Sequence, residues 1–212
     1  MPRLLCFGDS NTHGTPPIDQ RGVYARYDAA TRWPTRLAAT LGPDWEVAEE
    51  GLPGRTAQFP DPVMGAHMDG NIGLRIALNT HGPLDWLAIS LGTNDVKARF
   101  GATPGKVLSG LAGLVDYALA PEMAARHPDL RILLIAPAPV QETGCLAGEF
   151  LGGAAKSQAL APLIAGLARA RGCMFLDAGA HAEVSPTDGV HLTPDGHAAL
   201  AEAVAQALTA AA

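Results

Sequence analysis

The sequence has few cysteines, and they give no sign of a disulfide framework. It contains three, Cys6, Cys145 and Cys173, which is an odd number without a Cys-x-x-Cys pair. Cys6 and Cys173 lie in short apolar runs, where a buried reduced thiol is the ordinary finding. Reduced cysteines suit a reducing compartment, so a fold held together by disulfides is not expected.

Long apolar runs and clustered positive charge are also lacking. The apolar stretch of residues 4–8 is too short for the core of a signal peptide, and no run reaches the length of a membrane-spanning helix. Lys and Arg are scattered through a chain of net charge −6, whereas binding to nucleic acid needs a clustered positive surface. We therefore expect a cytoplasmic protein with neither a membrane nor a nucleic acid as partner.

Aromatic residues make up only 5% of the 212 residues, but the apolar fraction of 48% is enough for one buried core. The length fits one α/β domain, and we expect residues 1–212 to form a single domain. Short apolar runs without polar alternation predict strands that are buried on both faces. These runs are residues 4–7, 45–48, 86–91, 132–136 and 173–176.

Helical periodicity separates these runs. The spacing of apolar residues predicts helices over residues 33–41, 104–126, 154–171 and 194–208. Strands that alternate with helices imply a parallel sheet covered on both faces, here of about five strands, with ligands beyond the carboxyl ends of the strands. Residues 51–81 and 137–153 show little periodicity. They are predicted to be long loops, which are usually functional or involved in assembly.

A serine follows the first predicted strand. Ser10 lies where this strand gives way to a turn or a helix, so its Oγ can face the cleft. Its backbone N–H could then stabilise a developing oxyanion. The alternative is a helix N-cap, since all four residues from Asp9 to Thr12 cap well. Taken alone, this segment favours the cap.

A second group lies near the C-terminus. Asp188 precedes His191 by three residues, just before a predicted helix start. The carboxylate could accept a hydrogen bond from the imidazole Nδ1–H, which would leave Nε2 free as a general base. The alternative is an Asp188 that caps a turn and a His191 that is exposed to water.

Two further segments also follow predicted strands. Asn94, in the segment Gly-Thr-Asn-Asp of residues 92–95, offers a side-chain amide that can donate to an oxyanion without adding charge. Gly51, after the second strand, lets its backbone N–H approach a ligand oxygen. The alternatives are a cap or an Asx turn at Asn94 and a plain turn at Gly51.

Together these four segments resemble the four sequence blocks of the SGNH/GDSL hydrolase family, in the same order and over nearly the whole chain. The resemblance implies a serine esterase with Ser10 as nucleophile, His191 as base and Asp188 as acid. It also implies an oxyanion hole of the Ser10 and Gly51 backbone N–H groups and the Asn94 side chain. The implied fold is a flavodoxin-like three-layer α/β/α sandwich.

Residues 49–56, 83–97 and 175–179 are similar to the mycobacterial-type aryl esterase/acyltransferases. That resemblance implies hydrolysis of short acyl esters, or acyl transfer to alcohols or peroxide, without a cofactor. It also implies a homo-oligomer in which neighbouring subunits narrow the active-site entrance. The chain departs from this subgroup at His13, where Trp is common, and at Pro53-Gly54. Both departures lie beside the acyl site, so the preferred substrate stays open.

Several other residues have predicted places near the site. We expect the substrate pocket to include Asp9, Asn11, His13, Leu52 and Pro53. No metal site is expected, because the histidines lack tight ligand spacing. In the long loop, Phe59, Met64 and Met68 could pack at a subunit contact or fold the loop onto its own domain. Arg55 could contact an acid product or form an internal salt bridge.

Two other functions remain open. A carbohydrate acetyl esterase would apply the same triad to acetylated sugars. A catalytically silent binding domain is the alternative outside enzymology, since a fold does not fix a function. It is disfavoured because Ser10, Asn94 and the Asp188–His191 pair are all present.

Overall fold

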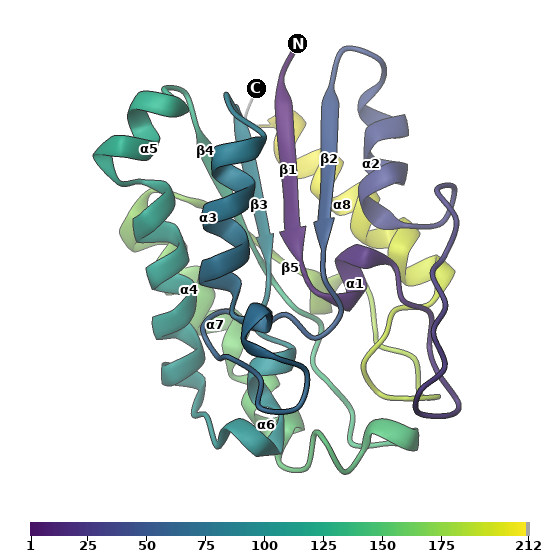
Figure 1. The fold of residues 1–212 in the computed structure, drawn as a ribbon. Coiled ribbons are helices and arrows are strands. Elements are labelled where there is room, and N and C mark those ends of the chain that lie inside the picture. The colour runs from purple at the N-terminus through teal and green to yellow at the C-terminus, as the bar shows by residue number, and fades with distance from the viewer. Residues whose placement is uncertain (211–212) are drawn as a thin grey trace.

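A five-stranded parallel sheet forms the centre of the molecule (Figure 1). The computed structural model describes residues 1–210. The strands are β1 (Arg3–Gly8), β2 (Glu46–Gly51), β3 (Trp86–Ser90), β4 (Arg131–Ala136) and β5 (Met174–Asp177). Their order, β2-β1-β3-β4-β5, is the flavodoxin-like order. The predicted α/β fold with about five parallel strands is thus confirmed.

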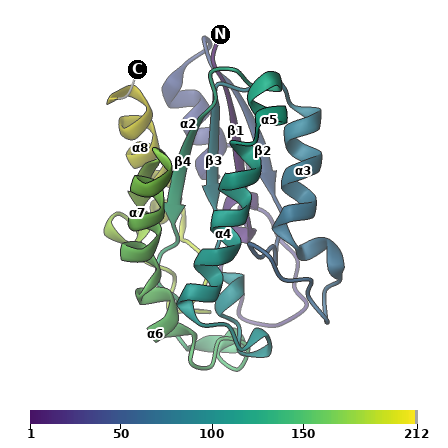
Figure 2. The ribbon, with the colours of Figure 1, turned by 90° about the vertical axis from the view of Figure 1, so that its left-hand side faces the viewer.

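Helices cover both faces of this sheet. They are α1 (Ser10–His13), α2 (Trp33–Leu41), α3 (Gly70–Thr80), α4 (Pro104–Ala118), α5 (Pro121–Arg126), α6 (Gly153–Gln158), α7 (Leu160–Arg171) and α8 (Pro194–Ala210). Figures 1 and 2 show α2 and α8 on one face and α3, α4 and α7 on the other, which gives three layers. None of the helices within residues 1–210 is long and apolar enough to cross a membrane.

The side chains of β1 explain why its sequence shows no polar alternation. Leu5 and Phe7 pack against the layer of α3, α4 and α7. Leu4 and Cys6 point to the opposite side and pack against α2 and α8. Successive side chains of a strand face opposite ways, so a strand between two helical layers needs apolar residues at every position.

Helix α3 corrects the prediction that all of residues 51–81 form a loop. The Asp69 side chain caps the helix by accepting from Asn71 N at 2.9 Å. Leu74 and Leu78, four residues apart, are fully buried against the sheet. Two glycines and two asparagines among its 11 residues lower the helix propensity, which hides this short buried stripe in the sequence.

Two predicted helices are each divided in the structure. The helix expected over 104–126 breaks before Pro121, whose ring forces Ala120 into an extended conformation with ψ of 150°. The helix expected over 154–171 breaks at Ala159. Pro162 lies in the first turn of α7, where its missing N–H cannot donate to the carbonyl of residue 158, so the hydrogen-bond pattern of α6 is not continued into α7.

Part of the loop between β2 and α3 folds onto its own domain. Met68 is buried, and the ring of Phe59 stacks on Phe100 with the centroids 5.1 Å apart. Phe59 and Met68 therefore pack against residues of their own domain. Met64 is more exposed and borders the cavity described below.

Candidate active site

Ser10 lies at the carboxyl end of β1 as the first residue of α1. The cap of this short helix is Asp9, whose side chain accepts from Asn11 N at 3.0 Å. The N-cap alternative therefore belongs to Asp9, and the Ser10 side chain borders a cavity. The first N–H groups of a helix have no intrahelical partner, so the Ser10 N–H remains available to a ligand.

Asp188 and His191 form a hydrogen-bonded pair in the loop before α8. A carboxylate can only accept, so the Nδ1–H of His191 donates to Asp188 Oδ2, at 2.6 Å. This bond orients the ring and leaves Nε2 free. His191 is 6% exposed and borders the same cavity as Ser10. The alternative of a water-exposed imidazole does not hold.

The Asp188 carboxylate is fully buried and accepts four hydrogen bonds. Oδ1 accepts from the N–H groups of Val190 and His191, each at 3.0 Å. Oδ2 accepts from Ile18 N at 2.8 Å in addition to the imidazole. Burial alone would raise the pKa of this carboxyl, but the hydrogen bonds and the nearby His191 hold it below its ordinary value. Asp188 is thus kept ionised.

A glycine makes this tight turn possible. Gly189 has a φ of +75°, which L side chains rarely adopt. A Cβ at this position would also come within 2.0 Å of Gln141 O. Gly189 N donates to Ser185 O at 2.8 Å, and Gln141 N donates to Gly189 O at 2.8 Å. The backbone that presents Asp188 and His191 is therefore fixed on both sides.

Asn94 lies just beyond β3, and one of its amide hydrogens is already used. Its Nδ2 donates to Arg55 O at 3.0 Å, the side chain is almost fully buried, and the residue borders the cavity. An amide nitrogen carries two donors, so the second N–H is free for a ligand.

The neighbouring Asp95 accepts from Ala57 N at 2.9 Å. Burial raises the pKa of Asp95 to about 7.

Arg55 ties together the backbone segments around Asn94 and Ser10. Its Nη1 donates to Gly8 O at 2.9 Å and also to Glu50 O. Its Cζ lies 4.1 Å from the centroid of the Phe7 ring. These contacts are with backbone carbonyl groups and an aromatic ring. They are therefore neither the internal salt bridge nor the contact with an acid product that the sequence suggested for Arg55. The guanidinium instead holds the carboxyl ends of β1 and β2 together.

A cavity of about 240 Å³ lies among these groups. Besides Ser10, Asn94 and His191, its lining residues are Thr15, Ile18, Val23, Tyr24, Pro53, Gly54, Met64, Lys97, Leu146, Glu149, Phe150 and Val190. Most of them are apolar, and the volume falls below the usual range for drug-sized ligands. Within residues 1–210, no hydrogen bond joins Ser10 Oγ to the imidazole. Such contacts often tighten only when substrate binds.

Of the five predicted pocket residues, Pro53 borders the cavity. Asp9 is turned inward as the helix cap. Leu52 N donates to Gly8 O at 3.1 Å, so this residue continues the pairing of β2 with β1. His13 contacts Thr15 Oγ1 and the Tyr24 hydroxyl, both at 3.3 Å, behind the cavity wall.

Asn11 has a structural contact rather than a place in the cavity wall. Its Nδ2 donates to Val190 O at 3.1 Å, and its Oδ1 accepts from Leu192 N at 3.0 Å. These two bonds fasten α1 to the loop that carries His191. Asn11 therefore fixes the position of Ser10 relative to the imidazole.

The structure places Gly51 away from the cavity. It lies against α1, where an added Cβ would come within 2.1 Å of His13 N. Gly54, three residues later, borders the cavity beside Ser10 and Asn94 and has a φ of +91°. The glycine that brings its backbone to the site is thus Gly54.

The sequence predicts long loops over residues 51–81 and 137–153, functional or involved in assembly, but does not identify the residues that wall the cavity. Ile18 comes from a stretch between α1 and α2 that has no periodic signal, yet its N–H binds Asp188. Glu149 and Phe150 lie in the second long loop and border the cavity. They are far from Ser10, Asn94 and His191 in the sequence, so no motif connects them with the site. Lys97 could have been found, since it lies three residues after Asn94 on the same short turn.

Comparisons with known proteins agree with this geometry. The sequence matches the model of the GDSL-like lipase/acylhydrolase family over residues 6–199. A carbohydrate acetylesterase from Sinorhizobium meliloti superimposes with a TM-score of 0.95 at 34% identity over 100% of both chains. The aryl esterase of M. smegmatis gives 0.93 at 35% identity over 99% of both chains. A putative arylesterase from Agrobacterium tumefaciens gives 0.89 at 37% identity, also over 99% of both.

A search of curated proteins found no match. The family model nevertheless covers most of the chain, so the protein belongs to the GDSL-like lipase/acylhydrolase family. Within that family it is a carboxylic ester hydrolase, and the predicted similarity to mycobacterial-type aryl esterases is confirmed.

Proposed function

We propose that this chain is a serine esterase that hydrolyses or transfers short acyl groups through an acyl-enzyme on Ser10. One observation carries the proposal: Ser10, the free amide hydrogen of Asn94 and the Asp188-oriented His191 all border one small, mainly apolar cavity. A nucleophile, an oriented base and oxyanion donors in one place are the parts that acyl transfer needs.

In the first step, Ser10 Oγ attacks the ester carbonyl carbon while Nε2 of His191 takes its proton. The carbonyl oxygen becomes an oxyanion, which the Ser10 N–H and the Asn94 side chain stabilise. We propose that the Gly54 N–H supplies the second backbone donor in place of Gly51, because Gly54 borders the cavity. The intermediate collapses, His191 protonates the leaving alcohol, and the acyl group stays on Ser10.

In the second step, His191 removes a proton from water or from another alcohol, which attacks the acyl-enzyme. Collapse releases the acid or the new ester and returns the proton to Ser10. Transfer competes with hydrolysis to the extent that the apolar walls exclude water. Val23, Tyr24 and Met64 form part of those walls.

The test of the proposed function is covalent labelling combined with a chain-length series. A fluorophosphonate probe should label one residue, Ser10, identified by peptide mass spectrometry. Hydrolysis of p-nitrophenyl acetate, butyrate and octanoate should fall with chain length, because the cavity is about 240 Å³. Absence of labelling together with only background hydrolysis would favour the silent binding domain.

Asn94→Ala removes the only side-chain donor proposed for the oxyanion. We expect kcat to fall on the order of 10²- to 10³-fold with KM little changed, since the interaction is made mainly in the transition state. Steady-state hydrolysis of p-nitrophenyl acetate measures this. Asn79→Ala, on the exposed face of α3, is the control and should retain full activity. An Asn94→Ala enzyme as fast as the wild type would remove Asn94 from the mechanism.

A second candidate, carbohydrate acetyl esterase, is favoured by the similarity to the Sinorhizobium meliloti enzyme of that description. The mainly apolar cavity favours small alkyl or aryl esters instead. Acetate release from acetylated xylose at a higher kcat/KM than from phenyl acetate would decide for the carbohydrate substrate.

We also propose a single domain over 1–212, a cytoplasmic location and a homo-oligomer. The three unpaired cysteines support a reducing compartment. Val23 and Tyr24, which line the cavity, are 55% and 76% exposed, and Val63, next to the lining residue Met64, is 74% exposed. An apolar group of this kind on the surface supports contact with a second subunit.

A further inference from the structure

Lys97 places an almost buried ammonium group in the wall of the candidate active site. Its side chain is 7% exposed, and the residue borders the same cavity as Ser10 and His191. The Nζ atom lies 5.5 Å from the centroid of the buried Phe150 ring. A charge removed from water in this way is costly unless hydrogen-bonding partners compensate it.

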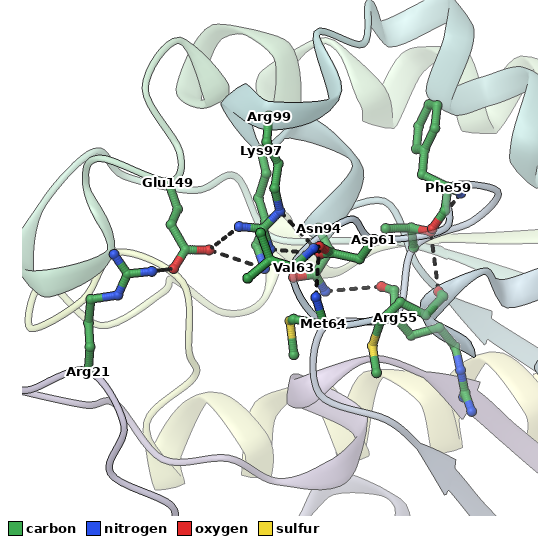
Figure 3. Close-up of polar contacts among 12 residues, drawn as sticks. Arg21, Arg55, Phe59, Asp61, Val63, Met64, Asn94, Lys97, Arg99 and Glu149 are labelled. Carbon is green, nitrogen blue, oxygen red and sulfur yellow. Dashed lines mark hydrogen bonds and ion pairs between the residues drawn. The ribbon is translucent and has the colours of Figure 1, made fainter. Parts of the chain in front are cut away.

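The carboxylate nearest to Lys97 is already occupied (Figure 3). Glu149 Oε2 lies 3.6 Å from Lys97 Nζ but only 2.9 Å from Arg99 Nη1. The other carboxylate oxygen, Oε1, pairs with Arg21. An ammonium carries three donors, and the guanidinium groups hold the closer positions on Glu149. Glu149 can take at most one of the three Lys97 donors, and Lys97 borders the cavity, so the other donors are available to a ligand bound there.

The charges around Lys97 do not balance. Arg99 also pairs with Asp61, at 2.7 Å. The three cations Arg21, Lys97 and Arg99 thus share the two carboxylates of Glu149 and Asp61, which leaves one positive charge in excess.

Two further titratable groups lie near this part of the cavity, His191 in its wall and Asp9 behind it. Asp9 is buried as the cap of α1, where its carboxylate accepts from Asn11 N at 3.0 Å, and none of the ion pairs within residues 1–210 joins it to Lys97. His191 would add positive charge when it takes a proton. Neither group forms an ion pair with Lys97 within residues 1–210, so the ammonium keeps donors for a ligand.

We propose that Lys97 is a specificity-determining residue that binds a carboxylate carried by the ester substrate, on either its acyl or its alcohol part. The inference rests on the proposed function and narrows its substrate class to small anionic monoesters. A carboxylate suits the site because it accepts charge-assisted hydrogen bonds from the free donors and neutralises the excess charge. The cavity of about 240 Å³ admits only a short spacer between this group and the reacting carbonyl.

The test uses two pairs of esters that differ only in charge. In the first pair, monoethyl succinate carries a carboxylate on its acyl part, and ethyl isocaproate carries an uncharged isopropyl group in the same place. β-Acetoxypropionate and isoamyl acetate carry them on the alcohol part. The measured quantity is the ratio of kcat/KM for the anionic ester to that for its isostere, obtained by pH-stat titration for each protein variant.

In Lys97→Met the ratio for one pair should fall about tenfold to a hundredfold, the size expected for a lost hydrogen bond to a charged group. The ester pair whose ratio falls shows whether the carboxylate that Lys97 binds lies on the acyl or on the alcohol part of the substrate. Glu149→Gln should raise the same ratio, because it removes the competing carboxylate. Lys106→Met, on the exposed side of α4, should leave the ratio at the wild-type value. Should Lys97→Met fail to fold, two other variants still decide. Lys97→Arg should keep the ratio near the wild-type value and Glu149→Gln should raise it, and an unchanged ratio in Glu149→Gln would overturn the proposal.

A binding measurement separates this proposal from the esterase proposal. Calorimetric titration of Ser10→Ala with monoethyl succinate and with β-acetoxypropionate needs no turnover. The better ligand should bind at least tenfold more weakly to Ser10→Ala/Lys97→Met. Two outcomes would overturn the carboxylate site and leave the serine mechanism standing. In the first, the wild type cleaves the esters but Lys97→Met shows the same kcat/KM ratios as the wild type. In the second, Ser10→Ala and Ser10→Ala/Lys97→Met bind the ligand equally well. Lys97-dependent binding without any ester cleavage would overturn the serine mechanism alone.

Discussion

Ser10→Ala is expected to lower kcat for p-nitrophenyl acetate on the order of 10⁶-fold, the loss seen when a serine enzyme loses its nucleophile. No other step can replace the bond between Oγ and the acyl carbon, so His191 and the oxyanion donors are left with water as the only attacking group. The residual rate should stay above that of the uncatalysed reaction, because the donors and the cavity remain. Stopped-flow kinetics should also show that the acylation burst has disappeared.

The folded state should tolerate this change. The Ser10 side chain borders the cavity, and Asp9, not Ser10, caps α1. The free energy of unfolding should therefore change by less than about 1 kcal/mol, as for substitutions outside named stabilising features. Ser109→Ala, on the exposed face of α4, is the matched control with wild-type kinetics. Equal rates in Ser10→Ala and wild type would refute the acyl-enzyme.

The central strands β1, β3 and β4 could be predicted from the sequence because they are buried on both faces, whereas the edge strands β2 and β5 are only half-buried. Four of the five apolar runs match the bounds of their strands to within one residue, and the run 45–48 ends three residues before β2 does. Helix α3 could not be predicted, since its stripe of Leu74, Ala77 and Leu78 is short and its glycines weaken the pattern. The breaks at Pro121 and near Pro162 follow from local chemistry and could have been predicted.

The candidate site divides in a similar way. Residues that follow strands directly, such as Ser10 and Asn94, could be placed at one edge of the sheet from topology alone. The cavity walls could not, because they come from loops whose paths depend on long-range contacts. Glu149 lies near Arg99 only through folding of a loop 50 residues later in the chain. For the same reason the sequence predicts Gly51, at the strand end, as the backbone donor, whereas the loop turns Gly54 toward the cavity.

Asp188→Asn should lower kcat by about 10⁴-fold while the overall geometry is retained, as the wrong imidazole tautomer does in serine enzymes. Asp188 accepts at both oxygens, from two backbone N–H groups on Oδ1 and from Ile18 N and His191 Nδ1 on Oδ2. An amide has only one acceptor oxygen, so its NH₂ group must face donors on one side. His191 then either turns away or presents Nδ1 as an acceptor and places the proton on Nε2.

The matched control is Asp177→Asn, at the carboxyl end of β5. Asp177 accepts a single hydrogen bond, from Gly179 N at 3.0 Å, which an Asn oxygen can also accept. This variant should keep the activity of the wild type on p-nitrophenyl acetate. Asp188→Asn with the same kcat as Asp177→Asn would show that the carboxylate does not orient the base.

The same substitution should change how stability depends on pH. The pKa of Asp188 lies below its ordinary value of 3.8 in the folded protein. The ionised carboxylate therefore contributes stability above about pH 4, and this contribution is lost as the pH falls through the folded-state pKa. The amide introduced by Asp188→Asn cannot titrate, so the stability deficit of the variant should be largest near pH 7 and shrink below pH 4. Urea unfolding of both proteins at pH 7, 5 and 3 measures it, and a deficit independent of pH would mean that Asp188 is not held ionised by His191 and the surrounding N–H groups.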